Sequence, residues 1–451
     1  MPATRLNRLA SASLAVGLAA SVAACGGGRT DTATPAGGGN TGGTTGGTTA
    51  SGAFTIDTSK CVGYEPTTGI TDTEIKLGTS GPQSGAYGAA FGPIKRGYEA
   101  YFKYVNDSKG GVKGRKITLV SKDDEYKSDI TRANIDEMVQ KDKVFGFVNV
   151  IGTPNNLAVR TSLGEKCIPN LYVGTGAVQW GEAAQYPWLV GSLPSYATEG
   201  AVFADYLKKE KPTAKVAILQ QNDDFGEGYT KAFEAAIKGS GITVSKIEKH
   251  EAGAGEVNAQ ITSLATDKPD ALLVASAALA CPAGVKAARG QQGWTPTIYV
   301  SATCNIKTLI DIGGLDNFKD TFTSAYLKDP ADAAFDSDAA IKEFKDLGKK
   351  NGLSDEDISS GAVAYGWLVG QLTVEAFDKA GELTRKGVME SAYNMKEAKF
   401  GLLRDGISVS TNGSTDPFPI ESLFVAKHDG TSFKAIGSLI NFDGKTGQFL
   451  K

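Results

Sequence analysis

Hydrophobic residues in most of this chain form short apolar runs that alternate with longer stretches of helical periodicity. Short apolar runs predict β-strands, and apolar positions spaced three and four residues apart predict amphipathic helices. Their alternation predicts parallel sheets covered by helices on both faces. The expected strands are residues 74–77, 116–120, 144–150, 170–173, 215–220, 242–247, 270–275 and 297–300, and the expected helices are residues 93–106, 128–141, 197–209, 227–238, 256–266 and 282–291.

The alternation occurs in two series, one on each side of Ser192, Leu193 and Pro194. Two series predict an α/β fold of two similar lobes with parallel-sheet cores. The run 144–150 is almost continuously apolar, as expected for a parallel strand that is buried on both faces. The last third of the chain differs: it has long helical patterns at 337–350, 359–380 and 384–397 and strand-like runs at 421–426 and 434–440.

The N-terminal segment has the pattern of an export signal. Arg5 and Arg8 precede an apolar stretch, residues 9–20, that is too short to span a bilayer as a mature helix. The stretch leads into Val22-Ala23-Ala24-Cys25, which resembles the bacterial lipoprotein signal. We therefore expect residues 1–24 to be a signal peptide and Cys25 to be lipidated, with ordinary cleavage and a free cysteine as the alternative.

Glycine is unusually frequent, with 56 of 451 residues, and many of these glycines follow Cys25. The Gly- and Thr-rich segment 25–58 cannot bury enough apolar surface to fold and is expected to be a flexible tether. A lipid at one end of this tether would hold an exported protein at the outer face of the cell membrane.

The composition favours binding over catalysis. A net charge of −3 argues against a broad basic surface and therefore against a nucleic-acid partner. Two histidines leave little basis for a histidine metal site or a histidine general base. The chain has no Gly-x-Ser-x-Gly, Ser-x-x-Lys or His-Glu-x-x-His motif. We therefore expect a non-enzymatic protein without a metal or another cofactor.

Four cysteines remain if Cys25 carries lipid: Cys61, Cys167, Cys281 and Cys304. An even number in an oxidising compartment predicts two disulfides, for which three pairings are possible. Metal binding is the alternative, but the spacing contains no Cys-x-x-Cys.

Several local motifs follow one another along the chain from about residue 71. They are Ile75-Lys76-Leu77-Gly78 with Ser80-Gly81-Pro82 and Tyr87-Gly88, the turn Gly110-Gly111-Val112-Lys113-Gly114, the strand end Asp123-Asp124, and Asp223-Asp224-Phe225-Gly226-Glu227-Gly228. In this order they resemble the solute-binding lipoproteins of branched-chain amino acid-type ABC importers, which are type I periplasmic-binding proteins. The resemblance covers the chain from there to its C-terminus.

The resemblance implies two lobes that are joined by three crossings, expected near Pro194, Tyr326 and Arg404. Lobe 1 would hold residues 59–193 and 327–404, and lobe 2 would hold residues 194–326 and 405–451. Closure of the lobes about this hinge is the expected motion. The layout favours the disulfides Cys61–Cys167 and Cys281–Cys304, because each pair then lies within one lobe. The second pair closes a short loop, which is worth ~3 kcal/mol in the chain-entropy model.

The same resemblance places ligand contacts in turns that follow strands. Such turns open helix N-termini and present free backbone N–H groups, which bind carboxylates. Gly152 and Thr153 follow one expected strand, and Gly174, Thr175 and Gly176 follow the next. The structural alternatives are a helix cap at Thr153 and a turn that only needs glycine torsions. Tyr87 and Phe225 match aromatic positions that line the cleft of that family.

One stretch departs from the resemblance. Where amino-acid binders carry a glutamate for the ligand ammonium, this chain has Ser301-Ala302-Thr303-Cys304, without an acid. The expected contacts are instead Thr303 and the small residue Ala278. A buried ammonium without a carboxylate partner is costly, so a carboxylate without an ammonium, such as an aromatic or short-chain acid, fits better than an α-amino acid. A neutral solute remains open.

The leading interpretation is an exported, lipid-anchored, monomeric solute-binding protein that delivers a small molecule to an ABC importer permease. A ligand-sensing receptor component of the same fold, without transport, is the alternative. An extracellular hydrolase with an unrecognised site is a third hypothesis, which the missing nucleophile motifs disfavour.

Overall fold

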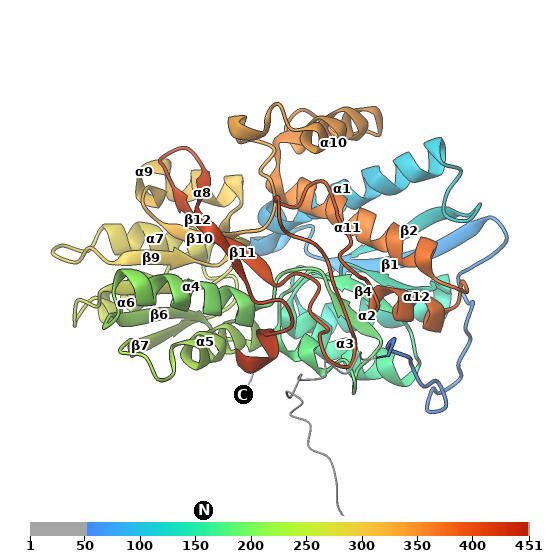
Figure 1. The fold of residues 1–451 in the computed structure, drawn as a ribbon, viewed down its shortest axis with the longest axis horizontal. Helices are drawn as coiled ribbons and strands as arrows, with labels where there is room; N and C mark the ends of the chain where they lie inside the picture. Colours follow the sequence, from blue (N-terminus) through green and yellow to red (C-terminus); the bar gives the residue numbers. More distant parts are fainter. Residues whose placement is uncertain (1–51, 450–451) are drawn as a thin grey trace, which may run out of the picture. The chain divides into compact units, whose positions relative to one another are not determined.

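The computed structural model describes residues 52–449. The expected signal peptide 1–24, Cys25 and most of the expected tether 25–58 lie outside the described residues. Residues 52–449 form one compact unit, and this unit contains two β-sheets (Figure 1). No helix among residues 52–449 combines the length and the apolar character needed to cross a lipid bilayer.

The first lobe is built on a five-stranded sheet in the order β2-β1-β3-β4-β5, with every pair parallel. Its strands are β1 Glu74–Gly81, β2 Lys116–Asp123, β3 Gly146–Val148, β4 Asn170–Val173 and β5 Leu189–Gly191. Its helices are α1 Gly85–Ser108, α2 Ser128–Glu137, α3 Thr153–Glu165, α10 Ala339–Lys350, α11 Gly361–Lys379 and α12 Arg385–Ala392.

The second lobe is built on a seven-stranded sheet in the order β12-β11-β10-β9-β8-β6-β7. The pairs from β7 to β10 are parallel, whereas β11 pairs antiparallel with β10 and β12 pairs antiparallel with β11. The strands are β6 Lys215–Gln221, β7 Thr243–His250, β8 Ala271–Ala275, β9 Thr297–Val300, β10 Phe322–Ala325, β11 Ser422–His428 and β12 Phe433–Asn441. The helices are α4 Tyr196–Glu210, α5 Asp224–Ile237, α6 Asn258–Leu264, α7 Ala280–Arg289, α8 Lys307–Gly313 and α9 Leu315–Phe318. The predicted α/β fold with two parallel-sheet cores is confirmed.

The chain passes between the two sheets at more than one segment. It leaves β5 through residues 192–195 to reach α4, and it leaves β10 at Tyr326. Leu327 forms an antiparallel bridge with Leu403, and the Arg404 backbone N–H donates to the Tyr326 carbonyl at 2.9 Å. These two segments therefore run side by side between the lobes.

The chain enters the second sheet later than expected from the boundary near Arg404. Val409 forms a bridge with Ala398, and Phe418 packs with Trp180 and Leu189 of the first lobe. The apolar residues of this segment thus bury against lobe 1 before β11 begins at Ser422.

The folded part also begins before residue 59, the expected start of lobe 1. The backbone N–H of Phe54 donates to Asn394, and that of Ile56 donates to Glu390 at 2.8 Å. Ile56 is only 2% exposed. These two apolar side chains interrupt the polar composition of the predicted tether, and burying them fixes its last residues on α12 and the residues that follow it.

For some helices and strands, the ends predicted from the sequence pattern were wrong. The helix expected from Pro93 begins at Gly85, because its first turns bury Tyr87, Ala90 and Phe91. The helix expected to run to residue 397 ends at Ala392. The strand expected over 144–150 is limited to 146–148, since Asn149 has a left-handed φ of 50° that ends the regular ladder. β5, β10 and α8 are short and were not expected.

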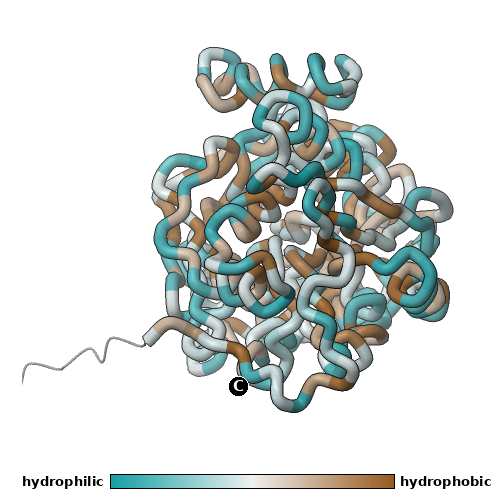
Figure 2. Tube along the Cα trace, turned by 90° about the vertical axis from the view of Figure 1, so that its right-hand side faces the viewer, coloured by the Kyte–Doolittle hydropathy of each residue, from teal (hydrophilic) through white to brown (hydrophobic). Residues whose placement is uncertain are grey.

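Hydrophobic residues form buried clusters inside both lobes. Hydrophilic residues, in teal, are interspersed with hydrophobic ones along the outer turns of the side seen in Figure 2. In the first lobe α1 and α11 pack at close range: a Cβ at Gly97 would clash with the Val363 carbonyl oxygen, and one at Gly366 with that of Ile94. Each lobe holds one disulfide, Cys61–Cys167 and Cys281–Cys304, with Cα atoms 5.5 Å and 6.1 Å apart. The favoured pairing is thus confirmed in the structure.

Candidate functional site

A cavity of about 520 Å³ lies between the lobes, and residues of both lobes line it. We call its inner end the part lined by Gly152, Gly174, Thr175 and Glu199. We call its outer part the region lined by Ile306, Ile310, Leu315, Phe433 and the N-terminus of α11. A concave, mostly apolar site with a few converging polar groups is the usual form of a small-molecule binding site.

The first lobe contributes two turns to the inner end, each directly after a strand. Gly152 stands between β3 and α3, with φ +104°, and a Cβ there would lie 2.8 Å from Cε2 of Tyr126. Gly174 and Thr175 follow β4. All three border the cavity, but their own backbone N–H groups are used inside the protein: those of Gly152, Gly174 and Thr175 donate to the carbonyls of Gly174, Val150 and Val173.

Thr153 and Gly176 do not border the cavity but hold these turns in place. The Thr153 hydroxyl lies 2.6 Å from that of Thr175, which also lies 3.2 Å from the Tyr196 hydroxyl of α4. A Cβ at Gly176 would clash with the Pro194 carbonyl oxygen. Gly176 therefore allows the first crossing segment to pass close to the second turn.

Tyr87 links the lobes without lining the cavity. Its ring stacks on Tyr126 with centroids 3.9 Å apart, and it is Tyr126 that borders the cavity. The Tyr87 hydroxyl donates to Oε1 of Gln221 at 3.1 Å and accepts from the Gly253 N–H at 3.0 Å, and both partners belong to lobe 2. Burial raises the pKa of Tyr87, so the hydroxyl keeps its proton.

The expected aromatic residue of the second lobe, Phe225, lies at the cavity and is 2% exposed. The preceding Asp223 caps α5, since its carboxylate accepts from the N–H groups of Phe225 at 3.1 Å and Gly226 at 3.2 Å. Trp180 is packed in the first lobe, where its indole N–H donates to the Thr175 carbonyl at 3.0 Å.

Of the two contacts predicted from the stretch without an acid, Thr303 borders the cavity and Ala278 does not. Ala278 is fully buried, and its neighbour Ala277 supplies the apolar surface. The Thr303 hydroxyl donates to Oγ of Ser301 at 3.1 Å.

A buried carboxyl group that the sequence did not suggest lies beside this stretch. Glu199 of α4 is 3% exposed and borders the cavity. Its Oε1 accepts from the Ala302 N–H at 2.6 Å and the Ser324 hydroxyl at 2.8 Å, and its Oε2 accepts from the Ser301 hydroxyl at 3.3 Å. The place that lacks an acid in the local sequence thus receives one from a helix about 100 residues earlier.

All the hydrogen-bond donors to Glu199 are neutral, and among the described residues it forms no ion pair with a Lys or Arg. Burial raises the pKa of Glu199 to about 7, and the donors offset this only in part. Near neutral pH the group can carry a proton or accept a hydrogen bond from a ligand, and the neighbouring Tyr229 hydroxyl is a further neutral group that lowers its pKa.

One signal could have revealed Glu199. The helix predicted over 197–209 has small and apolar residues at Ala197, Ala201 and Ala204, and Glu199 lies among these buried positions rather than on the polar side. A charged residue within a buried helical face needs a partner or a function. Only the structure shows that its neighbours are Ala302 and Ser324.

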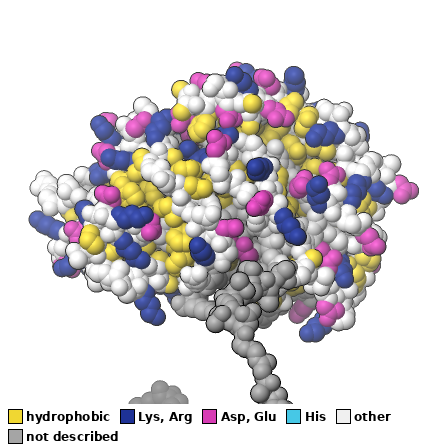
Figure 3. All heavy atoms as spheres, in the orientation of Figure 1, with side chains coloured by type: hydrophobic (Ala, Val, Ile, Leu, Met, Phe, Trp, Pro, Cys, Tyr) yellow, Lys and Arg dark blue, Asp and Glu magenta, His cyan; other side chains and the backbone are white. Residues whose placement is uncertain are grey.

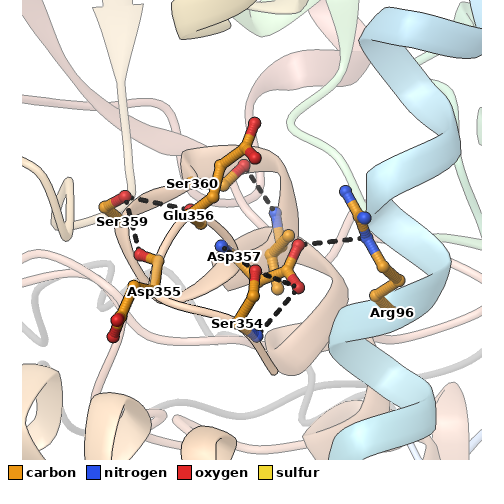
Figure 4. Close-up of polar contacts among 8 residues, drawn as sticks. Arg96, Ser354, Asp355, Glu356, Asp357, Ser359 and Ser360 are labelled. Carbon is orange, nitrogen blue, oxygen red and sulfur yellow. Dashed lines mark hydrogen bonds and ion pairs between the residues drawn. The ribbon is translucent and has the colours of Figure 1, made fainter. Parts of the chain in front are cut away.

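Charged residues surround the outer part of the cavity. Lys434 of β12 and Asp332 form an ion pair at 2.5 Å. On the first lobe, Asp357 accepts from Nε of Arg96 on α1 at 3.0 Å and from the Ser354 backbone N–H and hydroxyl (Figure 4). These contacts fix the loop that leads through Ser359 into Gly361 at the start of α11, both of which line the cavity.

One group of carboxyls among the described residues has the spacing of a cation site. Oxygen atoms of Asp416, Glu421 and Asp443 lie within 4.8 Å of one another. Glu421 accepts from the N–H groups of Gly444 at 2.8 Å and Thr446 at 3.1 Å. Burial and the neighbouring Glu421 raise the pKa of Asp416 to about 8, so a proton shared within the group relieves its repulsion. The group does not border the cavity.

Comparison with known proteins identifies the fold and the family. The family model described as "Periplasmic binding protein" matches residues 74–429. Leu/Ile/Val-binding protein homolog 3 of Brucella melitensis is 27% identical over 194 residues, which are 42% of this chain and 51% of that protein. The chain thus spans about half the length of this curated relative.

Two solved structures share the fold. A branched-chain amino acid ABC transporter protein from Thermus thermophilus with bound valine has a TM-score of 0.73 at 20% identity, over 82% of this chain and 97% of that one. A fatty acid ABC transporter substrate-binding protein from Thermomonospora curvata has a TM-score of 0.68 at 19% identity, over 85% and 94%.

Proposed function

The chain belongs to the periplasmic binding protein family, and on this premise we propose that it is the extracytoplasmic solute-binding protein of an ABC importer. It captures a small carboxylate between its lobes and delivers it to a membrane permease. One observation carries the proposal: residues of both lobes line a single cavity, so a bound solute contacts both lobes and favours their closed arrangement.

The inner end supports a carboxylate as the recognised group. Gly152 borders the cavity immediately before α3, so the positive end of the helix dipole lies beside it, together with the first-turn N–H groups of Thr153 and Asn155, which precede the first intrahelical hydrogen bond. Gly174 and Thr175 add a second turn and a hydroxyl. The acid is branched-chain amino acid-like or an aromatic or short-chain acid. Glu199 weakens the sequence-based preference for acids without an ammonium, because a carboxyl is present in the cavity.

A thermal-shift and calorimetric panel tests this function. We would use the protein from Ser51 onward, because the described residues 52–449 form one compact unit and Phe54 and Ile56 contact the fold. Branched-chain amino acids, aromatic acids and short-chain acids form the panel. A true solute at 100 times its Kd stabilises the protein by about 2.7 kcal/mol. The matched primary amide of each binding acid is the control, and we expect it to bind at least about tenfold more weakly.

Failure of every solute in the panel would contradict the proposed function. Product release from esters, amides or glycosides would instead revive the hydrolase hypothesis. Deleting the gene should abolish cellular uptake of the solute that binds. Unchanged uptake together with a lost cellular response would favour the ligand-sensing alternative.

We also propose that Cys25 carries a lipid that holds the protein at the outer face of the cell membrane. Replacing Cys25 with Ala should move the protein from the membrane fraction to the medium or periplasm. Retention of the variant in washed membranes would show that another segment anchors it.

A further inference from the structure

The cavity is larger than its inner end requires. At ~30 Å³ per water molecule, about 520 Å³ holds about 17 water-sized groups. This is roughly twice the number of non-hydrogen atoms in a branched-chain amino acid. If a head group binds at Gly152, Gly174 and Thr175, much of the remaining volume lies in the outer part.

Apolar side chains of both lobes form part of the cavity wall. Phe91 and Ile94 of α1 line the cavity on the first lobe. Ile306, which precedes α8, and Ile310 within α8 line it on the second. Leu193 lines it at the first crossing. A solute body that lies along these residues is removed from water, while Asp329 and Arg404 supply charged groups elsewhere in the lining.

The apolar lining continues to the protein surface. Leu315, the first residue of α9, lines the cavity and is 43% exposed. Ile312 of α8 is 53% exposed but does not line the cavity. Large hydrophobic side chains are otherwise rarely exposed in the described residues. Figure 3 shows hydrophobic side chains gathered on this face of the second lobe, over α8 and β12.

On the first lobe, the loop that borders the outer part of the cavity is held in place by side-chain contacts. Asp357 is 5% exposed and binds Arg96 of α1 as well as Ser354, so the loop before α11 is tied to the helix that also carries Phe91 and Ile94 (Figure 4). The outer part is therefore a formed extension of the cavity, and both members of the Asp332–Lys434 ion pair line the cavity.

Resting on the proposed function but replacing the short acids named there by a longer one, we infer that the solute is an elongated amphiphilic carboxylate, with its head group at the inner end and an acyl or aryl-alkyl body of roughly eight or more carbons along Ile306, Ile310 and Leu315. The class is set by the shape and polarity of the cavity: a polar end that is closed and buried, an apolar path, and a partly open rim.

The first test is a series of straight-chain carboxylates from butanoate to dodecanoate, measured by calorimetry below their micelle-forming concentrations. Each methylene that becomes fully buried should lower Kd by about fourfold. We expect Kd to fall with chain length by about two- to fourfold per methylene, and then to level off once the chain reaches the rim.

Two matched pairs of variants locate the chain. Ile306→Trp fills the apolar path, whereas Thr308→Trp adds the same ring at an exposed position that does not line the cavity. Ile306→Trp should weaken dodecanoate binding at least about tenfold and change butanoate binding less than about twofold. Leu315→Ser should weaken dodecanoate binding about three- to tenfold, and Ile312→Ser should leave it unchanged. Melting temperatures of the ligand-free variants verify that each protein is folded.

The possible results distinguish a failure of this inference from a failure of the proposed solute-binding function. Binding of short acids or valine with no gain from longer chains would overturn the elongated solute and leave the solute-binding function intact. Equal effects of Ile306→Trp and Thr308→Trp would overturn the assigned path. If no solute of any length binds, the proposed function itself fails.

Discussion

The two lobes border the same cavity by different means. The first lobe uses backbone turns directly after β3 and β4, which place Gly152, Gly174 and Thr175 at the cavity. The second lobe uses side chains from separated segments: Glu199 of α4, Thr303 after β9, and Ser324 at the end of β10.

This difference teaches which parts of a site a local pattern can reveal. A glycine-rich turn between a strand and a helix is a continuous piece of sequence, so its geometry and its position at the sheet edge are predictable together. A carboxyl in the middle of a helix obtains its surroundings from distant segments. The predictions below probe this contrast from the largest expected effect to the smallest.

Removing the disulfide of each lobe in turn shows how much each disulfide contributes to the free energy of unfolding. Cys61–Cys167 joins residues 106 apart in sequence, whereas Cys281–Cys304 joins residues 23 apart. In the chain-entropy model, the paired Cys→Ser variants lose about 5 kcal/mol for the first bridge and about 3 kcal/mol for the second. Denaturant unfolding of the two double variants measures the difference. Equal losses, or a larger loss for the second bridge, would contradict an entropic origin.

Glu199→Gln tests the side-chain contribution of the second lobe through its pH dependence. In the folded protein the pKa of Glu199 is about 7, above its ordinary value of 4.5. Between these pH values the folded state binds the proton more strongly than the unfolded state, so this group contributes stability at low pH that is lost as pH rises to 7. The full loss is about 3 kcal/mol.

The glutamine variant should therefore be more stable than the natural protein at pH 8, by up to about 3 kcal/mol, and nearly equal to it at pH 4. Its neighbours Tyr196, Tyr229 and Tyr326 have pKa values raised by burial and stay neutral over this range. Chemical unfolding at both pH values measures the effect, and the same difference at both would refute it. The variant should also distinguish two classes of ligand. It should weaken the binding of amines and leave the binding of acids without an amino group unchanged.

Gly152→Ala tests the backbone contribution of the first lobe, with Gly114→Ala as its control. Both glycines have positive φ, but a Cβ at Gly114 meets nothing within 4 Å, whereas one at Gly152 meets the Tyr126 ring. We expect a cost of about 1 kcal/mol at Gly114 and about 2–3 kcal/mol at Gly152. Only Gly152→Ala should weaken solute binding, which calorimetry measures. Equal binding by both variants would remove Gly152 from the site.

Tyr87→Phe probes the bond between the lobes. The variant loses the hydroxyl that binds Gln221 and Gly253, which is worth about 1 kcal/mol to the closed arrangement. Solute affinity should fall about fivefold, and small-angle scattering should show a more open ligand-free protein. The control is Tyr98→Phe, whose hydroxyl contacts Thr79 within the first lobe. A fall of equal size in this control would point to a general loss of stability.

Much of the fold followed from the sequence because its signals are local. The apolar runs predicted most strands of both sheets. The two series of strands and helices predicted that the fold has two lobes. Short elements such as β5 and β10 carry few residues and too little periodicity to be predicted. The start of α1 was misplaced because packing of Tyr87 and Phe91 extends the helix through Pro93, which is normally a first-turn residue.

The sequence by itself determined the α/β class, two lobes and the turns at Gly152 and Gly174, since each depends on residues that are neighbours in the chain. Only the tertiary structure decided that Glu199 meets Ala302 and Ser324, that Tyr87 contacts the other lobe, and that Phe418 stays with the first. These contacts join segments far apart in sequence, and the packing of whole elements brings them together. The length of the cavity was decided in the same way, because its walls come from α1, α8 and α9 on opposite lobes.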